Sequence, residues 1–508
     1  MKKMEEIKRA LISVFYKDGL EDIVKKLASL NIEIYSTGGT YNFIKSLGVD
    51  VKTVESLTSY PSILGGRVKT LHPKVFGGIL ARRDNNEDKQ QLSEYSIPEF
   101  DLVIVDLYPF EQTVKSGASE ADIIEKIDIG GISLIRAAAK NYKDVLIVPS
   151  VERYAELMEV LNKDNGKTSI ETRRRFATYA FLTSSHYDTM IFNYFNQQTS
   201  LDAFTQNYYN PTSLRYGENP HQKGMFFGNL DEDFVQLHGK EISYNNIGDI
   251  DAACNLIDDF SETTFAIIKH NNACGIATRD TLNQAYIDAL ACDPVSAFGG
   301  VFVTNRNIDI TTAEQMNKMF MEVCIAPSYD KDALELLFSK KNRIILQRKQ
   351  INKNKYTFRS ALNGVLFQER DTKVETIEEI KSITNRQFTD KEKQDLIFAN
   401  ILVKHTKSNA IVIAKNRQIL ASGTGQTSRV DALKQAIEKA KSFGFDLHGA
   451  VMASDAYFPF KDCVTIAHQE GIDLIIQPGG SIRDKESIDF CQENNMAMAM
   501  TGFRHFRH

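Results

Sequence analysis

Apolar and polar residues alternate in blocks along the first 150 positions of the chain. The runs "ALISVF" (10–15) and "IEIYS" (32–36) are short and mostly apolar, whereas "LEDIVKKLASL" (20–30) and "TYNFIKSLG" (40–48) repeat their apolar residues at helical intervals. Two further runs, "DLVIVDLY" and "DVLIVPS", are almost continuously apolar, as strands are when helices cover both faces of a parallel sheet. The pattern predicts an α/β domain with a parallel sheet.

The pattern becomes helical between about 160 and 200 and ends in the polar, aromatic segment "NQQTSLDAFTQNYYNPTS". We therefore place a first domain at 1–200 and a second at 201–508. Short strands return at "TFAIIKH", "NAIVIAK", "AVMASD" and "DLIIQPGG", with helices such as "RVDALKQAIEKAKSFG" between them, so the second domain is also α/β. The Lys-, Arg-, Asn- and Glu-rich region of about 340–395 predicts exposed connections and surface helices between two subdomains.

Composition places the chain among ordinary globular proteins. A length of 508 residues predicts roughly two to four domains. Hydrophobic content of 42% with charged content of 25% excludes disordered, collagenous and membrane classes. No run approaches the ~18 apolar residues of a membrane span, and the start "MKKMEEIKRALISVF" carries acidic residues where a secretory signal is apolar. We expect a cytoplasmic protein with no membrane contact.

The net charge argues against a nucleic-acid ligand, and the cysteine pattern argues against a transition metal. A formal net charge of -5 provides no global field for nucleic acid, so any anion must be held by local basic residues. The six cysteines contain no CxxC pair, and His468-Gln469-Glu470 is not followed by the PCxxC motif of a zinc deaminase. We expect reduced core thiols and no transition metal.

Several loops of the first domain carry candidate anion ligands. "STGGT" puts Ser36, Thr37, Gly38 and Thr40 between a strand and a helix, where hydroxyls and free N–H groups suit a phosphate. A plain helix cap followed by a glycine turn explains this segment equally well. "LGGRVKTLHPKVFGGILARR" packs cations and hydroxyls between two Gly-Gly pairs, which is typical of a loop that grips an anion.

Two more loops follow predicted strands. "VDLYPF" places Tyr108 at a strand end, and "KIDIGGISLIRAAAKN" sets Asp128 before Gly130, Gly131 and a helix that carries Lys140. Taken singly, Asp128 is explained as a helix cap and Lys140 as a surface residue. Because open α/β sheets bind ligands at their strand ends, the convergence of these loops predicts one site.

Taken in order, "STGGT", "LGGRVKTLHP", "LYPF", "IDIGG" and "RAAAKN" closely resemble the cyclohydrolase half of the bifunctional AICAR transformylase/IMP cyclohydrolase family. The second half adds "SLRYGENPHQKG", "IKHNNACGIA", "DPVSAFGGV", "VKHTKSNAIVIAKN", "SDAYFPFKD", "IQPGGSIRD" and the terminal "FRHFRH", so the likeness covers nearly the whole chain. The resemblance implies a methylglyoxal synthase-like N-terminal domain. It also implies a C-terminal transformylase region of two cytidine deaminase-like α/β subdomains without zinc.

The implied activity comprises two reactions of de novo purine biosynthesis. A formyl group moves from the co-substrate 10-formyltetrahydrofolate, a reduced folate, to the 5-amino group of AICAR. The resulting formyl-AICAR then closes to IMP with loss of water. The AICAR amine is a weak nucleophile because its lone pair is conjugated with the imidazole carboxamide, so it needs a group that removes its proton.

The adjacent Lys269 and His270 in "AIIKHNNACG" fit that need. Neighbours on a strand point to opposite faces, so inside a core one of them would be an awkward buried group, whereas at the strand's end both reach a cleft. The resemblance makes His270 the base, and Lys269 its partner at the formyl oxygen or the departing folate nitrogen. Asn409 orients the amine and formyl groups. Which of the pair moves each proton stays open.

The resemblance also implies the binding residues. The AICAR phosphate is assigned to Arg215 and Arg504, the nucleotide to Tyr216, Phe506 and His508, and His221 lies in the same entrance motif as Arg215. The folate site draws on Phe298, Phe458 and the loop around Pro478, since a pterin ring needs stacking surfaces. Ring closure is assigned to Lys69, Tyr108, Asp128 and Lys140. The nucleotide contacts of that reaction are Ser13, Lys17, Ser36, Thr37, Gly38, Thr40, Arg67, Thr70, Gly130 and Gly131.

Two segments depart from the family pattern. Asp106 stands where the family usually has Asn before "LYPF", and "ISVFYKDG" replaces the commoner "SVSDK" while leaving Ser13 and Lys17 matched. An acidic group at 106 alters hydrogen bonding and local pKa values. We expect this to tune the site, because the "YPF" context is intact.

The resemblance further implies a homodimer with transformylase sites at the subunit interface, and a bound potassium ion stays open. One competing hypothesis makes the first domain a sensor of a phosphorylated metabolite that regulates a C-terminal enzyme. Another, RNA binding through "RHFRH" and "ARR", is disfavoured by the acidic net charge and the lack of interleaved aromatic stripes. We therefore expect no nucleic-acid partner, and we expect the terminal tail to dock on its domain.

Overall fold

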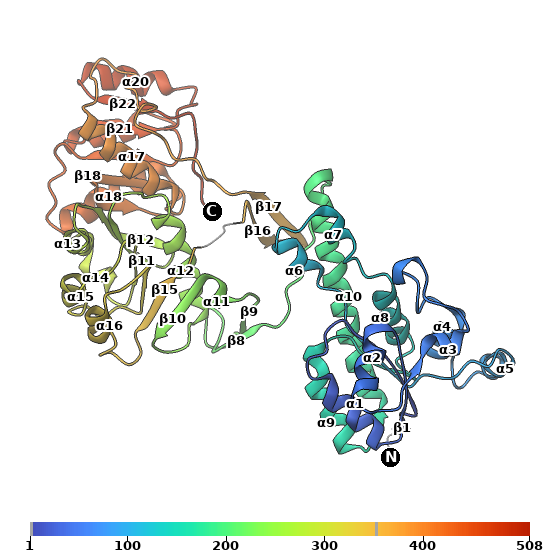
Figure 1. The fold of residues 1–508 in the computed structure, drawn as a ribbon. Coiled ribbons are helices and arrows are strands. Elements are labelled where there is room, and N and C mark those ends of the chain that lie inside the picture. Colours follow the sequence, from blue (N-terminus) through green and yellow to red (C-terminus); the bar gives the residue numbers. More distant parts are fainter. Residues whose placement is uncertain (1–3, 351–353) are drawn as a thin grey trace. The chain divides into compact units, whose positions relative to one another are not determined.

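The structure is a computed structural model that describes residues 4–350 and 354–508 (Figure 1). The chain divides into two compact units, an N-terminal unit that ends at Tyr208 and a C-terminal unit from Tyr209 to His508. The division follows the long helix α10 (Ile170–Thr199), in a segment without regular structure.

The N-terminal unit is built on a five-stranded parallel sheet in the order β4-β3-β2-β5-β6. Its strands are β2 (Arg9–Ser13), β3 (Glu33–Ser36), β4 (Lys52–Thr53), β5 (Leu102–Val105) and β6 (Leu146–Val148). β5 and β6 are buried at every position, which is why their apolar runs are unbroken. The predicted parallel sheet is confirmed. A separate antiparallel pair joins β1 (Met4–Glu6) to β7 (Lys167–Ser169).

Helices cover both faces of this sheet. One face packs against α1 (Leu20–Ser29), α2 (Gly38–Ser46) and α9 (Tyr154–Lys163), and the other against α4 (Pro73–Leu80), α8 (Gly130–Lys140) and α10. The buried side of α1 consists of its leucines, isoleucine and valine, as its amphipathic pattern predicts. Shorter helices occupy the connections: α3 (Val54–Thr58), η1 (Leu64–Gly66), α5 (Asn86–Glu94), α6 (Phe110–Lys115), α7 (Glu120–Ile124) and η2 (Val151–Arg153).

The C-terminal unit contains an 11-stranded sheet in the order β10-β15-β14-β13-β11-β12-β19-β18-β20-β21-β22. The strands of its first half are β10 (Phe234–His238), β11 (Thr264–Lys269), β12 (Asn272–Thr278), β13 (Val301–Thr304), β14 (Val323–Ala326) and β15 (Ile344–Arg348). Those of its second half are β18 (Ile411–Lys415), β19 (Gln418–Gly423), β20 (Val451–Ser454), β21 (Leu474–Gln477) and β22 (Ala497–Met500). A small antiparallel pair, β8 (Thr212–Leu214) and β9 (Gly224–Phe226), precedes this sheet along the chain.

The large sheet repeats one topology twice. In each half, the first strand of a hairpin pairs antiparallel with a strand that begins a parallel run of three. These strands are β11, β13, β14 and β15 in the first half and β18, β20, β21 and β22 in the second. The halves meet through β12 and β19, where Ala277 pairs with Gln418. The hairpin turns that end β11 and β18 are therefore equivalent positions.

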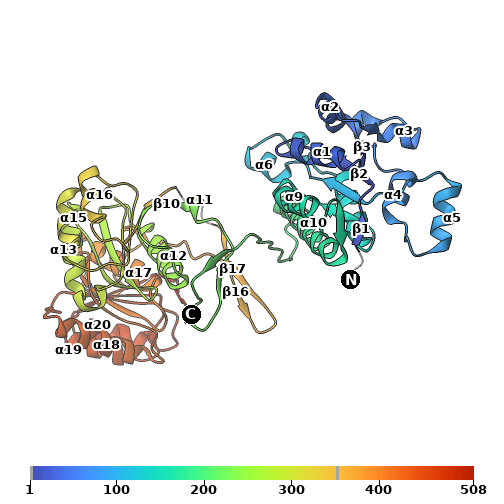
Figure 2. The same ribbon diagram turned by 90° about the horizontal axis from the view of Figure 1, so that it is seen from below.

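The helices of the C-terminal unit follow the same duplication. One face of the sheet is covered by α12 (Tyr244–Ile257) and α17 (Asp390–Lys404), one from each half. The other face carries α13 (Leu282–Cys292), α15 (Ile310–Met316) and α16 (Lys331–Leu337) in the first half, and α18 (Arg429–Ser442), α19 (Asp462–Gln469) and α20 (Asp484–Glu493) in the second (Figure 2). Two short helices, α11 (Leu230–Asp233) and α14 (Pro294–Ala297), complete the unit. Among the described residues of the whole chain, every helix is too short or too polar to cross a membrane.

The region of about 340–395 differs from the expectation of surface helices. β15 is a strand of the large sheet, and β16 (Tyr356–Ala361) pairs antiparallel with β17 (Gly364–Glu369) in an exposed hairpin. Its segments "YTFRSA" and "GVLFQE" mix aromatic and β-branched residues with polar ones, a composition that favours strands over helices. Leu362, with a φ of 51°, lies in the turn that closes the pair.

Candidate active sites

In the N-terminal unit, three loops meet at the carboxyl edge of the parallel sheet. Ser13 ends β2, Ser36 ends β3, and Asp106 directly follows β5. These strands are neighbours in the sheet, so the loops that leave them are neighbours too. This edge is where an open α/β sheet binds its ligands.

The hydroxyl residues at the end of β3 and just beyond it bond to β2 and to the loop that follows β2. Ser36 Oγ donates to the Ile12 carbonyl at 2.7 Å, and Thr40 Oγ1 donates to the Val14 carbonyl at 2.8 Å. Thr37 is the N-cap residue of α2 but its side chain caps no backbone N–H; its hydroxyl lies 3.2 Å from Ser13 Oγ. The plain helix-cap interpretation of "STGGT" is therefore wrong for the side chains, which instead fix the loop after β2.

Lys69 lies over the start of α2. A Cβ atom added to Gly66 would lie 2.7 Å from Lys69 Cε, and one added to Gly38 would lie 3.6 Å from Lys69 Nζ. Gly66 also has a φ of 94°, which favours glycine. The Gly-Gly pair thus gives the ammonium group room beside the helix N-terminus, where the helix dipole favours an anion.

Asp128 lies close to both Lys69 and Tyr108. Its carboxylate accepts the Gly131 N–H at 2.6 Å, and its own N–H donates to the Tyr187 hydroxyl at 2.9 Å. Burial raises the pKa of Asp128, although the N–H groups of residues 108, 130 and 131 and the charge of Lys69 oppose that rise. A carboxyl with a raised pKa beside an ammonium group and a phenol suits proton transfer.

Asp106, the departure from the family pattern, is buried and hydrogen-bonded. Its carboxylate accepts the N–H of Tyr16 at 2.9 Å and also that of Phe15. Burial raises the pKa of Asp106. The ring of Phe15 meets Tyr108 edge-on, with centroids 5.6 Å apart. Asp106 therefore holds the altered "VFYK" loop against a predicted catalytic residue.

The other residues predicted for this site are spread more widely than Lys69, Tyr108 and Asp128. Lys17 Nζ donates to the Phe15 carbonyl at 2.9 Å, and burial lowers its pKa. Arg67 pairs with Glu125, and Thr70 Oγ1 lies 3.2 Å from where a Cβ atom on Gly130 would be. Lys140 is the last residue of α8, about 15 Å along the helix axis from its start. The structure gathers Lys69, Tyr108 and Asp128, and leaves Lys140 apart from them.

In the C-terminal unit, Lys269 and His270 begin the turn between β11 and β12. Lys269 is the last residue of β11 and is half-buried, while His270 is exposed with a φ of 51°. Lys269 Nζ donates to the Phe298 carbonyl at 2.7 Å. The N–H of Asn271 donates to Asp249 Oδ1 on α12 at 2.7 Å. Because the chain leaves the strand here, neither side chain is forced into the core.

Asn409 lies in a segment that hydrogen-bonds to this turn. Lys407 N–H donates to Asn272 Oδ1 at 3.2 Å, two residues before Asn409. Asn409 Nδ2 donates to the Gln426 carbonyl at 3.0 Å, and its Oδ1 accepts from Arg429 at 3.0 Å. The structure thus orders the amide side chain beside the Lys269–His270 turn.

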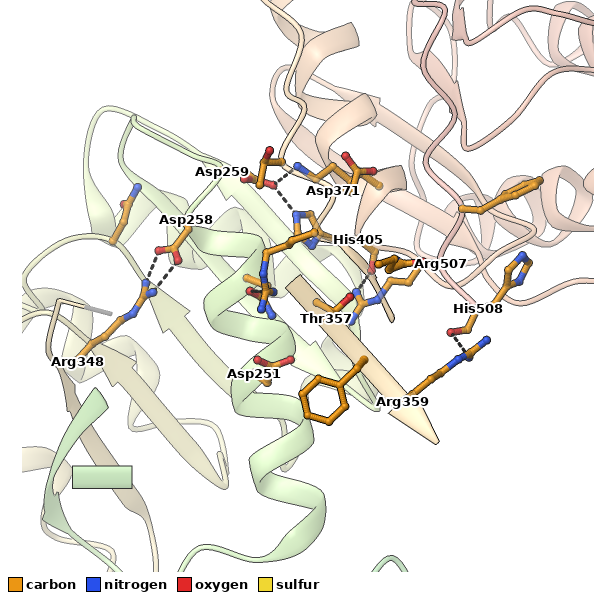
Figure 3. Close-up of a pocket in the computed structure, with 18 of the residues that line it drawn as sticks. Asp251, Asp258, Asp259, Arg348, Thr357, Arg359, Asp371, His405, Arg507 and His508 are labelled. Carbon is orange, nitrogen blue, oxygen red and sulfur yellow. Dashed lines mark hydrogen bonds and ion pairs between the residues drawn. The ribbon is translucent and has the colours of Figure 1, made fainter. Parts of the chain in front are cut away.

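The carboxyl-terminal tail docks on the same segment. Ser408 N–H donates to the Arg507 carbonyl at 2.9 Å, and Arg507 N–H donates back to Ser408 Oγ at 3.0 Å. Arg504, Phe506 and His508 line a cavity of about 1350 Å³ (Figure 3). Figure 3 also shows Arg359 of β16 bonded to the His508 carbonyl, at 3.3 Å. The tail is therefore part of a binding surface, in line with the expected docking.

The same cavity is strongly polar. Asp258 forms a two-pronged ion pair with Arg348 at 2.5 and 2.7 Å, and Asp259 bonds to His405 at 2.5 Å (Figure 3). Lys269, His270 and Asn409 are not among its lining residues. In the described part of one chain, the tail and the Lys269–His270 turn are linked through 407–409 without facing one cavity.

Several predicted ligands lie elsewhere in the C-terminal unit. Arg215, Tyr216 and His221 follow β8, where the Arg215 guanidinium lies over the Tyr216 ring at 5.6 Å, and they do not line the cavity. Phe298 is largely exposed, with its ring 5.1 Å from that of Phe320. Phe458 differs from the expectation: it is 0% exposed inside the core of the second half, so its ring offers no stacking face.

The loop around Pro478 also supports the tail. The Pro478 carbonyl accepts the Gly502 N–H at 3.0 Å, and Pro478 itself is buried. Its neighbours Gly480, which is exposed, and Ser481, which is half-buried, donate their N–H groups to Asp484 at 2.6 and 3.0 Å. Sequence reasoning did not identify three residues that hold the site: Asp249, Asp371 and His505. Of these, only His505 lies in a segment that the sequence singled out, the terminal "FRHFRH".

Known proteins are similar to this chain over its whole length. A family model described as "AICARFT/IMPCHase bienzyme" matches residues 138–439, and one described as "MGS-like domain" matches residues 19–133. A Bacteroides thetaiotaomicron protein named "Bifunctional purine biosynthesis protein PurH" is 62% identical over 508 residues, which is all of both chains. Proteins of the same name from Persephonella marina and Caldicellulosiruptor saccharolyticus are each 46% identical and cover 99% of this chain and 100% of their own length. Among solved structures, "Crystal structure of ForH" is 32% identical, covers 37% of this chain and 96% of that chain, and has a TM-score of 0.34.

Proposed function

Because this chain belongs to the bifunctional AICAR transformylase/IMP cyclohydrolase family, we propose that its two reactions are divided between its two units. The chain is an AICAR formyltransferase and an IMP cyclohydrolase of purine biosynthesis, and 10-formyltetrahydrofolate is its co-substrate. In the proposed division, the C-terminal unit transfers the formyl group and the N-terminal unit closes the ring. The observation that carries this division is that Lys69, Tyr108 and Asp128 gather in one unit, whereas the Lys269–His270 turn and Asn409 gather in the other.

Formyl transfer takes place at the turn after β11. His270 removes a proton from the AICAR amine as the amine attacks the formyl carbon, which general-base help accelerates typically about 10²- to 10⁴-fold. The Lys269 ammonium, held by the Phe298 carbonyl at 2.7 Å, stabilises the negative charge on the formyl oxygen and then supplies a proton to the departing folate nitrogen. Asn409, fixed by Arg429 and Gln426, orients the amine and the formyl group.

The nucleotide phosphate is bound by Arg504 with Arg215, and Phe506 and Tyr216 contact the nucleoside. Phe298 and the loop at Pro478 form the folate side of the site, where Phe298 supplies an exposed aromatic face. Arg504 and Phe506 line a cavity that Arg215, Tyr216 and Lys269 do not reach in one chain. This separation supports a homodimer in which the transformylase site is completed at the subunit interface.

A mixing experiment tests this shared site. Arg215→Ala and Arg504→Ala each remove formyl transfer as homodimers. If each site combines Arg215 of one subunit with Arg504 of the other, random subunit exchange restores roughly a quarter of the wild-type rate, since half of the dimers are mixed and each has one intact site. No recovery after demonstrated exchange contradicts the interface site, as does a fully active monomer by light scattering.

Ring closure takes place at the carboxyl edge of the parallel sheet. The carboxamide nitrogen of formyl-AICAR attacks the formyl carbon while Asp128 accepts its proton, and Lys69 stabilises the oxyanion. Tyr108 is assigned to the loss of water, and Lys140, which lies apart from Lys69, Tyr108 and Asp128, is left without a step. Lys17, Arg67, Ser13, Ser36, Thr37 and Thr70 are assigned to the nucleotide and its phosphate, together with the backbone of Gly38, Gly130 and Gly131.

A potassium ion fits beside Asp455, next to the transformylase loop. Asp455 is fully buried; one carboxylate oxygen accepts from Arg429 at 2.8 Å, while the other makes no hydrogen bond within the part of the chain that the structure describes. A buried carboxylate oxygen without a donor suits a hard cation. Such an ion would neutralise charge there and order the neighbouring loops. We also infer a cytoplasmic location, because the six cysteines, all buried or half-buried, form no disulfide in the part of the chain that the structure describes.

A further inference from the structure

The side chain of His505 is buried between two carboxylates. It is 3% exposed, its Nδ1 bonds to Asp371 Oδ2 at 2.7 Å, and its Nε2 lies 3.6 Å from Glu375 Oε1. Glu375 is buried as well and accepts from Asn400 Nδ2 of α17 at 2.6 Å. Buried charges are costly unless they are paired, so removing one partner of this group leaves an uncompensated charge beneath the tail.

The backbone of the tail is fixed at the same point. His505 N–H donates to the Asp455 carbonyl at 3.0 Å, so the histidine also touches the loop that bears the buried carboxylate near Asn409. Its two neighbours in sequence, Arg504 and Phe506, line the cavity, with the Arg504 guanidinium 4.4 Å from the Phe506 ring centroid. The buried histidine therefore separates two exposed residues that the transformylase uses for its nucleotide.

We propose that His505 is a positioning residue for formyl transfer: as an imidazolium held between Asp371 and Glu375, it fixes the tail so that Arg504 and Phe506 face the nucleotide. The proposal rests on the proposed role of the tail in binding AICAR. Nδ1 makes a hydrogen bond to Asp371, whereas Nε2 makes no hydrogen bond to a described residue and lies 3.6 Å from Glu375, so it is the positive charge of the imidazolium that both carboxylates attract.

The electrostatics of the site agree with this protonation state. Burial lowers the pKa of His505, but Asp371 and Glu375 outweigh burial and raise its pKa to about 9. Two further charged groups lie close to this pair: Lys404 of α17, which is near Asp371 and forms an ion pair with Asp259 at 3.0 Å, and Lys373, whose N–H donates to Asp371 Oδ1 at 3.3 Å and whose ammonium lies 5.1 Å from the Phe503 ring centroid. Because the folded-state pKa lies above the ordinary value, the contact is fully present at acidic and neutral pH and is lost as the pH rises through about 9.

The test is steady-state kinetics of the full chain carrying His505→Gln, which keeps one donor and loses the charge. We expect the KM for AICAR to rise about 10-fold or more, in keeping with the loss of a buried charge-assisted hydrogen bond, while kcat changes less. In the wild type, KM for AICAR rises above pH 9, and in His505→Gln that rise is absent. Asp371→Asn raises KM in the same way. Ring closure of supplied formyl-AICAR stays unchanged in both.

His448 provides a matched control, because it also pairs with an aspartate, Asp446, at 2.8 Å, yet its side chain is 83% exposed. His448→Gln leaves the KM for AICAR unchanged. Hydrogen exchange of the wild-type and variant chains supplies a readout independent of activity: residues 503–508 exchange faster in His505→Gln and Asp371→Asn and not in His448→Gln.

Arg504→Ala separates this inference from the function on which it rests. A raised KM in Arg504→Ala together with an unchanged KM and unchanged tail exchange in His505→Gln overturns the positioning role alone. An unchanged KM in Arg504→Ala overturns the tail as an AICAR site, and the positioning role with it. A His505→Gln chain that loses kcat with no change in KM shows a merely structural role and also overturns the proposal.

Discussion

Asp106 shows how a single changed residue is accommodated at the ring-closure site. Where the resemblance leads us to expect an amide, the chain has a buried carboxylate that accepts the N–H groups of both Phe15 and Tyr16. A carboxylate accepts on both oxygens, whereas an amide accepts on one and donates from the other side. The loop that differs in sequence and the acid that differs in sequence are therefore a bonded pair.

Asp106→Asn tests this pairing. We expect kcat/KM for ring closure to fall roughly 5- to 10-fold, because one backbone N–H loses its acceptor at a cost of about 1 kcal/mol. The charge of Asp106 opposes the lowering of the Lys17 pKa that burial causes, so the substitution lowers that pKa further. If Lys17 contacts the phosphate as a cation, the alkaline limb of the ring-closure profile moves to lower pH.

The matched control for this prediction is Asp101→Asn. Asp101 lies at the other end of β5, where Oδ2 accepts the N–H groups of Lys8 and Arg9 at 2.7 and 2.8 Å. The control variant lowers the melting temperature without moving the pH profile. If Asp106→Asn changes neither the kcat/KM of ring closure nor its pH profile, Asp106 has no role at the ring-closure site.

At the scale of elements, the duplicated sheet contains two equivalent hairpin turns, one after β11 and one after β18, and only the first carries predicted catalytic residues. The turn after β11 is held by Asp249 of α12, and the turn after β18 by Asp395 of α17, each through a backbone N–H of the turn. The first turn carries Lys269 and His270. In the second, Arg279 donates to the Asn416 carbonyl at 2.7 Å and bonds to Asp288 at 2.5 Å, so its surroundings are filled by protein groups.

This equivalence gives a paired prediction. Asp249→Ala frees the turn after β11 and lowers kcat for formyl transfer roughly 10-fold, because a hydrogen bond to a charged group is worth about 1.5 to 3 kcal/mol. Asp395→Ala removes the corresponding contact from the other turn and lowers the melting temperature with little change in kcat. The measurements are kcat for formyl transfer and the melting temperature of each variant. Equal losses of kcat in Asp249→Ala and Asp395→Ala would contradict a catalytic role confined to the turn after β11.

Strong local patterns made most elements predictable. The strands β5 and β6 could be predicted because short, continuously apolar runs are typical of strands buried on both faces. Helix α1 could be predicted because its apolar residues recur on one face of a helix. The hairpin β16–β17 was missed because its charged composition looked like surface helix, whereas its aromatic and β-branched residues favour strands. The two-subdomain organisation was expected from the resemblance and not from the residues themselves, because "AIIKHNNACG" and "IVIAKNRQIL" share little beyond the lysine that ends the first strand of each hairpin.

The candidate sites were predictable in their residues more than in their geometry. Motifs located Lys69, Asp128, Lys269 and His270, because cations and acids beside glycines at strand ends have few structural uses. They did not reveal that Phe458 faces the core, since one aromatic in "DAYFPF" is locally like its neighbours. Nor did they reveal His505, whose burial depends on Asp371 and Glu375, more than 100 residues away in sequence.

At the scale of the whole molecule, the account depends on two separate sites in one chain. The N-terminal unit has its own parallel sheet and both faces covered, and the C-terminal unit has its own sheet and cores. Each unit therefore holds its predicted catalytic residues on an independent framework. A defect in one site is expected to leave the chemistry of the other intact.

The most direct measurement of this claim follows formyl-AICAR and IMP by mass spectrometry in the full chain carrying His270→Ala or Lys69→Ala. With AICAR and 10-formyltetrahydrofolate, the His270→Ala chain is expected to form neither product, yet to convert supplied formyl-AICAR at the wild-type rate. The Lys69→Ala chain is expected to stop at formyl-AICAR. Loss of both reactions in either folded variant, or normal IMP formation by Lys69→Ala, would contradict the division of the two reactions between the two units.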